Sequence, residues 1–179
     1  MRLSTFGKPR IISCAEHYSQ HIALPRGCQD ELINLLGELK IQPVVQDERF
    51  TGNNIPDLQF QGQLTDEQTQ AANKLLLHDI GTLSATTAFG KTVVALHILA
   101  KRQVNTLIIV HRRQLLDQWL ERIETFLNLP KKQIGKIGGG KNKPTGIVDV
   151  AIMQSLTKNH TVDDMVANYG QVIFDECHH

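Results

Sequence analysis

Three short apolar runs constrain the fold of this chain most: TLIIV at 106–110, VDVAIM at 148–153 and QVIF at 171–174. Each is nearly continuous in Val, Ile and Leu, which is typical of strands that are buried on both faces. Helical patterns lie between them, at 113–127 and 161–169. Strands and helices that alternate in this way predict an α/β fold built on a parallel sheet.

The same alternation begins near residue 61. We expect a helix at 65–79 with Thr65 as its N-cap, a strand at 81–86 and a helix at 91–102. The sequence therefore predicts one α/β domain over 61–179.

Residues 1–60 have a different pattern. A strand at 10–14, a helix at 29–39 and a second strand at 43–50 predict a small α+β N-terminal module. The turn-forming segment TGNNIPD at 51–57 follows these elements.

Composition excludes several classes of protein. Hydrophobic residues make up 41% and charged residues 21% of the chain, as in soluble globular proteins. No apolar run is long enough to span a bilayer, and MRLSTFGKPR lacks the apolar middle of a signal peptide, so we expect a cytoplasmic protein. Cys14, Cys28 and Cys177 are too few and too widely spaced for a disulfide framework. Cys14 and Cys28, with the histidines between them, do not match the spacing of a common zinc finger.

Polar residues follow each predicted strand of the second region. TAFGKT comes after the first strand, HRRQ after the second, QS after the third and DECHH after the fourth. In an open parallel sheet, ligands bind beyond the carboxyl ends of the strands. The four polar segments are therefore expected along one functional edge.

ATTAFGKT at 85–92 fits a phosphate-binding loop, except that Ala85 replaces the first glycine of the pattern. Gly90 permits close approach of the backbone, Lys91 reaches the β- and γ-phosphates, and Thr92 can hold Mg²⁺. We expect nucleotide contacts from Thr87, Ala88, Phe89, Gly90, Lys91 and Thr92. A purely structural turn is the alternative.

VIFDECHH at 172–179 supplies two adjacent acids at a strand end. Nucleotide chemistry with Mg²⁺ needs a carboxylate at the metal and a second group that orients the attacking water. Asp175 suits the first role and Glu176 the second. The alternative is that both acids cap a helix.

Positive charge is concentrated in two segments. KKQIGKIGGGKNKP at 131–144 has five Lys and no acid, and Arg112 and Arg113 follow the strand at 106–110. A glycine-rich basic loop can contact the phosphate backbone of a nucleic acid, although such segments are often merely solvated surface. Trp119 is expected to pack in the core rather than to stack on a base.

These segments resemble a known family. ATTAFGKT and DECH are similar to motifs I and II of the DExH helicases and translocases of superfamily 2. TLIIVHRRQLLDQW resembles motif Ia, IGGGK with DVAIMQSL resembles motifs Ib and Ic, and LTDEQTQAA resembles the motif that precedes the phosphate loop. The similarity is closest to the XPB-like and restriction-enzyme branch.

The resemblance implies a RecA-like P-loop sheet with helices on both faces, ATP and Mg²⁺ as cofactors, and DNA rather than RNA as the partner. It implies catalytic roles for Lys91, Asp175 and Glu176, Mg²⁺ ligands in Thr92 and Asp175, and an adenine contact from Gln68. His178 would couple ATP to nucleic-acid binding. The implied nucleic-acid contacts are Arg112, Arg113, Gly139, Gly140, Lys141, Gln154 and Ser155.

The family's motor has two RecA-like lobes, and these motifs belong to the first. We expect a second lobe in a longer chain, because efficient hydrolysis and stepping depend on it. In this class the strand after motif II pairs between the strands of motifs I and II, so the chain as given is expected to fold marginally. Two alternatives stay open: a P-loop protein of another type, and a non-catalytic nucleic-acid-binding remnant.

Overall fold

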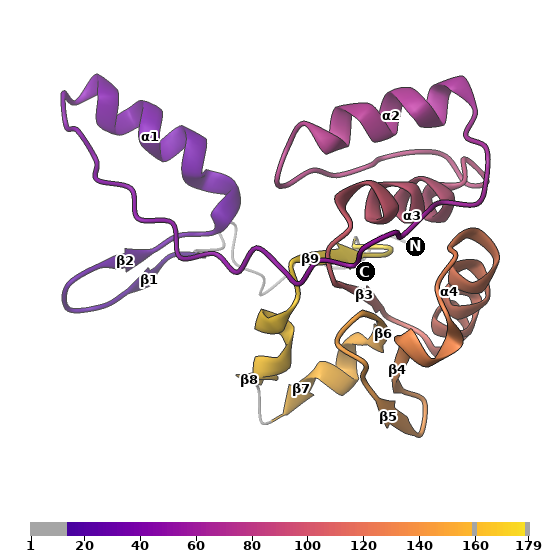
Figure 1. The fold of residues 1–179 in the computed structure, drawn as a ribbon. Helices are drawn as coiled ribbons and strands as arrows, with labels where there is room; N and C mark the ends of the chain where they lie inside the picture. The colour runs from indigo at the N-terminus through magenta and orange to yellow at the C-terminus, as the bar shows by residue number, and fades with distance from the viewer. Residues whose placement is uncertain (1–13, 159–160, 178–179) are drawn as a thin grey trace, which may run out of the picture. The chain divides into compact units, whose positions relative to one another are not determined.

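The computed structural model describes residues 14–158 and 161–177, which form two compact units divided after Asp47 (Figure 1). In the described part of the chain, no helix is long and apolar enough to cross a membrane.

The first unit contains a two-stranded antiparallel ribbon and one helix. Strands β1 (Glu16–His17) and β2 (Ile22–Ala23) pair, a 3-10 turn η1 (Arg26–Cys28) follows, and helix α1 spans Gln29–Glu38. The expected helix at 29–39 is confirmed, whereas the strand at 10–14 lies almost wholly outside the described residues.

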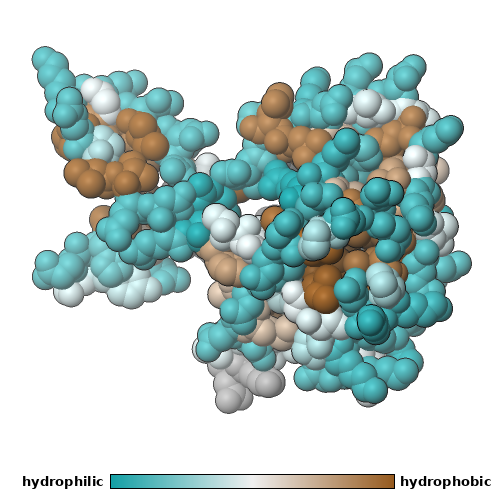
Figure 2. All heavy atoms as spheres, viewed as in Figure 1, coloured by the Kyte–Doolittle hydropathy of each residue, from teal (hydrophilic) through white to brown (hydrophobic). Residues whose placement is uncertain are grey.

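The prediction of a strand at 43–50 is wrong. Residues 41–50 have no regular structure, and Val44 is 98% exposed. A strand needs a partner for its backbone groups, and this segment pairs with none of the described strands. Exposed apolar side chains also gather on α1, where Figure 2 shows a brown patch. They include Leu32, Ile33 and Leu35, and the exposed Leu39 directly follows the helix.

The second unit is built on a five-stranded sheet with the order β5-β4-β6-β3-β9. Strands β4 (Ile134–Gly138), β6 (Val148–Ile152), β3 (Thr106–Val110) and β9 (Gln171–Phe174) are parallel. Strand β5 (Lys141–Lys143) is antiparallel to β4. The α/β fold with a parallel sheet is therefore confirmed, and all five residues of β3 are buried.

Alternate residues of the strands enter two cores. On one face, Ile108, Val110, Val148 and Val150 pack against helices α3 (Lys91–Arg102) and α4 (Arg113–Phe126). On the other face, Leu107, Ile109 and Ala151 pack against 3-10 helices η3 (Met153–Leu156) and η4 (Asp164–Asn168). Helix α2 (Asp66–Leu76) packs on α3 through Ala72, Val94 and Ile98.

Two predicted elements differ from the structure near these cores. The helix expected at 161–169 is replaced by β8 (Thr161–Val162) and η4, because its β-branched start pairs with β7 (Thr157–Lys158). The basic loop expected at 131–144 is instead ordered: η2 (Lys131–Gln133), then β4, then a turn of three glycines into β5.

The strand predicted at 81–86 does not form either. This segment has no regular structure, and β9, the strand at the end of the sheet, pairs with β3 alone among the described strands. Val172 and Phe174 on β9 are 39% and 56% exposed. In residues 81–86 the one large apolar side chain is Leu83, and the segment pairs with none of the described strands.

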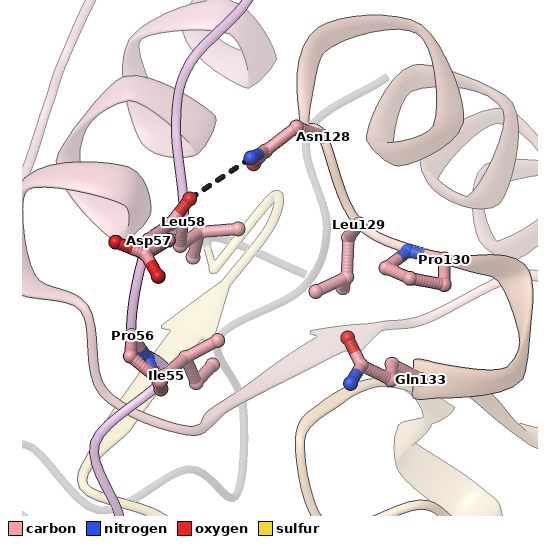
Figure 3. Close-up of a pocket in the computed structure, with 8 residues that line it drawn as sticks. All are labelled: Ile55, Pro56, Asp57, Leu58, Asn128, Leu129, Pro130 and Gln133. Carbon is pink, nitrogen blue, oxygen red and sulfur yellow. Dashed lines mark hydrogen bonds between the residues drawn. The ribbon is translucent and has the colours of Figure 1, made fainter.

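Residues 48–60 belong to the second unit, so the boundary expected at residue 60 falls inside that unit. The Asn128 side chain donates to the Asp57 carbonyl at 2.9 Å (Figure 3). It also accepts from the Gln59 amide at 2.6 Å. Ile55 and Leu58 are buried in the core beside it. A pocket lined by 55–58, 128–130 and 133 lies here, and none of the predicted site residues lines it.

One buried polar side chain joins three segments around the start of β3. Asn105 is 2% exposed, and its carbonyl oxygen accepts from the Asn53 and Gly170 amides at 2.8 and 3.0 Å. Its amide group donates to the carbonyls of Gly146 and Asn168 at 3.1 and 2.7 Å. Every hydrogen-bonding position of this side chain is therefore used.

Replacing this side chain tests its importance for stability. We expect Asn105→Ala to lower the free energy of unfolding by about 2–4 kcal/mol, because buried partners lose their hydrogen bonds. Urea denaturation followed by circular dichroism measures the change. Asn73→Ala on the exposed face of α2 is the control and should be close to neutral. Equal midpoints for both variants would contradict the role given to Asn105.

Candidate functional site: a phosphate loop and a basic edge

The segment before α3 has the backbone of an anion-binding turn. Ala88 and Gly90 have positive φ angles of 69° and 87°, and the Phe89 amide donates to the Thr86 carbonyl at 3.3 Å. Helix α3 begins at Lys91, and no side chain caps it at Gly90. The first amide groups of a helix without a side-chain cap are available to a phosphate, and the helix dipole favours negative charge there.

Helix α2 holds this loop through Gln68. Thr65 and Gln68 form a capping box, in which the Thr65 amide donates to Gln68 Oε1 at 3.0 Å. The same side chain donates from Nε2 to the Phe89 carbonyl at 2.8 Å. A Cβ atom on Gly90 would lie 2.6 Å from Nε2 and would displace the Gln68 side chain, and the φ angle of 87° itself favours glycine. Gln68 thus fixes the loop, and its predicted adenine contact stays a prediction.

Lys91 lies over the same loop. Its Nζ donates to the carbonyls of Ala85 and Thr86 at 3.2 and 3.4 Å. An ammonium group has three N–H donors, so these two long bonds leave a donor for an anion. The positive charge is therefore held next to the uncapped start of α3.

The sheet brings Asp175 to the same edge. The Asp175 amide donates to the Ile109 carbonyl at 3.0 Å, which extends the pairing of β9 with β3 by one residue. Helix α3 packs on β3 and reaches it through a short connection at 103–105, so the two run in opposite directions and α3 begins near the end of β3. Glu176 follows with a positive φ of 55°. His178 lies outside the described residues.

Basic residues gather around the turn between β4 and β5. A Cβ atom on Gly139 would lie 3.3 Å from Nε of Arg113, and one on Gly138 would lie 2.7 Å from Oγ of Ser155. The structure therefore places Arg113 and Ser155 next to the glycine turn. Their contact with nucleic acid stays a prediction. Gln154, Arg112 and Lys141 are also exposed, and the Cβ position of Gly140 faces open space.

A salt bridge supports this basic edge. Lys136 on β4 contacts Asp117 on α4 at 2.5 Å. The hydrogen bond from Lys136 lowers the pKa of the Asp117 carboxyl, and the positive charges of Arg113 and Lys141 lower it further. Asp117 therefore sits in a positive local field. Sequence analysis did not identify Asp117, because the pairing joins a helix to a strand formed later in the chain.

Trp119 makes a second contact that the sequence analysis missed. It is 3% exposed and packs in the core, as expected, but its indole Nε1 also donates to Asp175 Oδ2 at 2.7 Å. The only sequence signal for this bond is that Trp119 lies on the helix after β3, and that the residues after β3 and β9 are expected at one edge of the sheet.

Comparison with known proteins fits this arrangement. A family model described as Type III restriction enzyme, res subunit (ResIII) matches residues 61–179. The chain belongs to the ResIII family. Its ResIII region corresponds to the first RecA-like lobe of XPB-like helicases of superfamily 2, and the resemblance found in the motifs is thereby confirmed.

Three relatives illustrate the similarity. The DNA 3'-5' translocase XPB2 of Sulfurisphaera tokodaii is 34% identical over 117 residues, which are 65% of this chain and 25% of the relative. A putative ATP-dependent RNA helicase of Acanthamoeba polyphaga mimivirus is 31% identical over 131 residues, 70% of this chain and 24% of the relative. The putative DNA 3'-5' helicase Rad25 of Halobacterium salinarum is 32% identical over 101 residues, which are 55% of this chain and 16% of the relative. The chain thus spans a quarter or less of these relatives.

The hydrogen bond from Gln68 to the phosphate loop can be tested separately from the capping box. Gln68→Glu keeps an acceptor for the Thr65 amide but has no donor for the Phe89 carbonyl. We expect faster amide hydrogen exchange at 86–91 and little change in α2. The matched control, Gln70→Glu on the exposed face of α2, should leave both segments unchanged. Unchanged exchange of the loop in Gln68→Glu would show that it needs no such contact.

Proposed function

We propose that this ResIII chain binds ATP with Mg²⁺, and that the full-length protein hydrolyses ATP to unwind DNA or move along it. The observation that carries the proposal is the start of α3, where no side chain caps the helix and Lys91 is held beside it. Triphosphate is the ligand class that such a loop fits best.

The residues of the loop fit ATP. The amides at the start of α3 would donate to phosphate oxygens, and the third N–H of Lys91 would donate to the β- and γ-phosphates. The Thr92 hydroxyl and the Asp175 carboxylate are oxygen ligands of the kind that Mg²⁺ prefers. Gln68 would contact adenine while its present bond keeps the loop in shape.

Bound Mg²⁺ would neutralise charge that develops on the phosphates during transfer. Glu176, next to Asp175, would orient the attacking water and accept its proton. The left-handed backbone conformation of Glu176 turns the chain directly after Asp175, the proposed metal ligand.

The basic edge formed by Arg113, Lys136, Lys141 and the glycine turn supports a nucleic-acid partner. Guanidinium and ammonium groups next to accessible backbone favour phosphodiester contacts. Two of the three relatives named above are called DNA translocase or DNA helicase and one is called RNA helicase, so DNA is the partner that we propose.

The experiment that tests this function is ATPase activity with and without single- and double-stranded DNA, on this chain and on a form extended past residue 179. Stimulation by DNA in the extended form is expected. ATPase activity that does not change when DNA is added would favour a P-loop enzyme of another type. Salt-sensitive DNA binding without any turnover would favour a non-catalytic nucleic-acid-binding protein.

Removal of the loop lysine should abolish tight nucleotide binding. We expect Lys91→Ala to weaken ATP binding about ten- to hundredfold, because a charged hydrogen bond to phosphate is lost. Isothermal titration calorimetry measures the affinity. Lys101→Ala, in the last turn of the same helix, removes an equal charge away from the loop and should bind ATP normally. Equal affinities in the two variants would argue against phosphate binding at Lys91.

Removal of one arginine from the basic edge should change how DNA binding depends on salt. A plot of log affinity against log salt concentration has a negative slope. With Arg113→Ala this slope should become shallower by about one, as for the loss of one phosphate contact. Fluorescence anisotropy across a salt series gives the slope. Arg122→Ala, exposed and farther along α4, is the control. A slope unchanged from wild type in Arg113→Ala would place DNA elsewhere.

A further inference from the structure

The contact between Trp119 and Asp175 joins two segments that are 56 residues apart in the chain. Trp119 lies on α4 with only 3% of its surface exposed, among core residues such as Leu116 and Ile123. An indole N–H can only donate, and a buried donor without a partner is costly. The carboxylate of Asp175 supplies that partner at 2.7 Å.

The bond fixes the side chain of Asp175 as well as that of Trp119. The Asp175 backbone is already held by the Ile109 carbonyl on β3. Within the described residues, the indole is the one hydrogen-bond donor to this carboxylate. Because the indole donates to Oδ2, rotation of the Asp175 carboxylate is restricted and Oδ1 is left to bind a cation.

Helix α4 also reaches the basic edge. Arg113, at its start, lies against Gly139, and Asp117 binds Lys136. Trp119 follows Asp117 by two residues on the same rigid helix. The carboxylate at the nucleotide side and the cations at the nucleic-acid side are therefore attached to one element.

We propose that Trp119 is a positioning residue, whose indole holds the Asp175 carboxylate in the orientation that binds the Mg²⁺ of bound nucleotide and makes that orientation depend on helix α4. The proposal rests on the proposed function, because it assumes nucleotide binding with Mg²⁺ at Asp175. Its basis is the directed bond from a buried donor, which core packing alone does not require.

Substitution by an aromatic residue without a donor tests the role. Trp119→Phe keeps most of the packing and removes the N–H. We expect nucleotide affinity in EDTA to stay near wild type, while the gain in affinity produced by Mg²⁺ falls about tenfold, the range for a hydrogen bond to a charged group. Calorimetric titrations of ATP with Mg²⁺ and with EDTA give both values. Ile123→Val, which removes packing from the same buried face, should keep the full gain.

A spectroscopic measurement tests the bond without nucleotide. Trp119 is the only tryptophan in the chain, so the ¹⁵N-labelled protein gives a single indole N–H resonance. We expect Asp175→Ala to shift this resonance and to speed its hydrogen exchange. Titration of wild type with Mg²⁺ and ATP should shift the same resonance in step with binding.

The outcomes separate the two claims. If wild type binds no nucleotide, the proposed function fails and the positioning role fails with it. If wild type binds and Trp119→Phe keeps the whole Mg²⁺ gain, only the positioning role is overturned. An indole resonance that is unaffected by Asp175→Ala would also overturn it, because the hydrogen bond itself would be absent.

Discussion

The pairing of β3 on both of its sides is the constraint on which the second unit depends. Strand β3 is buried throughout and is parallel to β6 on one side and to β9 on the other. Parallel pairing places the carboxyl ends of all three strands at one edge, so the polar residues after each strand meet there. Asn105 fixes where β3 begins, since it binds backbone from three other segments. The position of Asp175 is thus a consequence of strand register.

Much of this unit could be predicted because its signals are local. A run such as TLIIV can be satisfied only by burial, and the pattern of 91–102 has a helical period with glycine before it, so α3 and β3 form where expected. The capping box at Thr65 and Gln68 is equally local, because its partners are three residues apart. The turn before α3, which has the sequence pattern of a phosphate-binding loop, is likewise one continuous segment.

The features that the sequence did not reveal all depend on distant partners. The segments at 81–86 and 43–50 have strand-like sequence patterns, but neither pairs with a strand of the described sheet. Conversely, the lysine-rich stretch at 131–144 becomes β4 and β5 because β6 offers it an edge. The hydrogen bonds of Gln68 to Phe89, Asp117 to Lys136 and Trp119 to Asp175 form only when separate elements pack. Single-sequence patterns carry no record of such packing.

The arrangement of α4 has a consequence for how two ligands could influence each other. This helix carries Arg113 at the basic edge and Trp119 at the Asp175 carboxylate, and its core is too well packed for one end to move alone. If Arg113 contacts nucleic acid and Asp175 holds Mg²⁺, as we propose, nucleic acid that displaced Arg113 would shift the indole and the carboxylate that it binds. By linkage, nucleotide bound at Asp175 would alter the affinity for nucleic acid by the same factor. Coupling between the two sites then needs no contact between the ligands, because a single hydrogen bond and a single helix connect them.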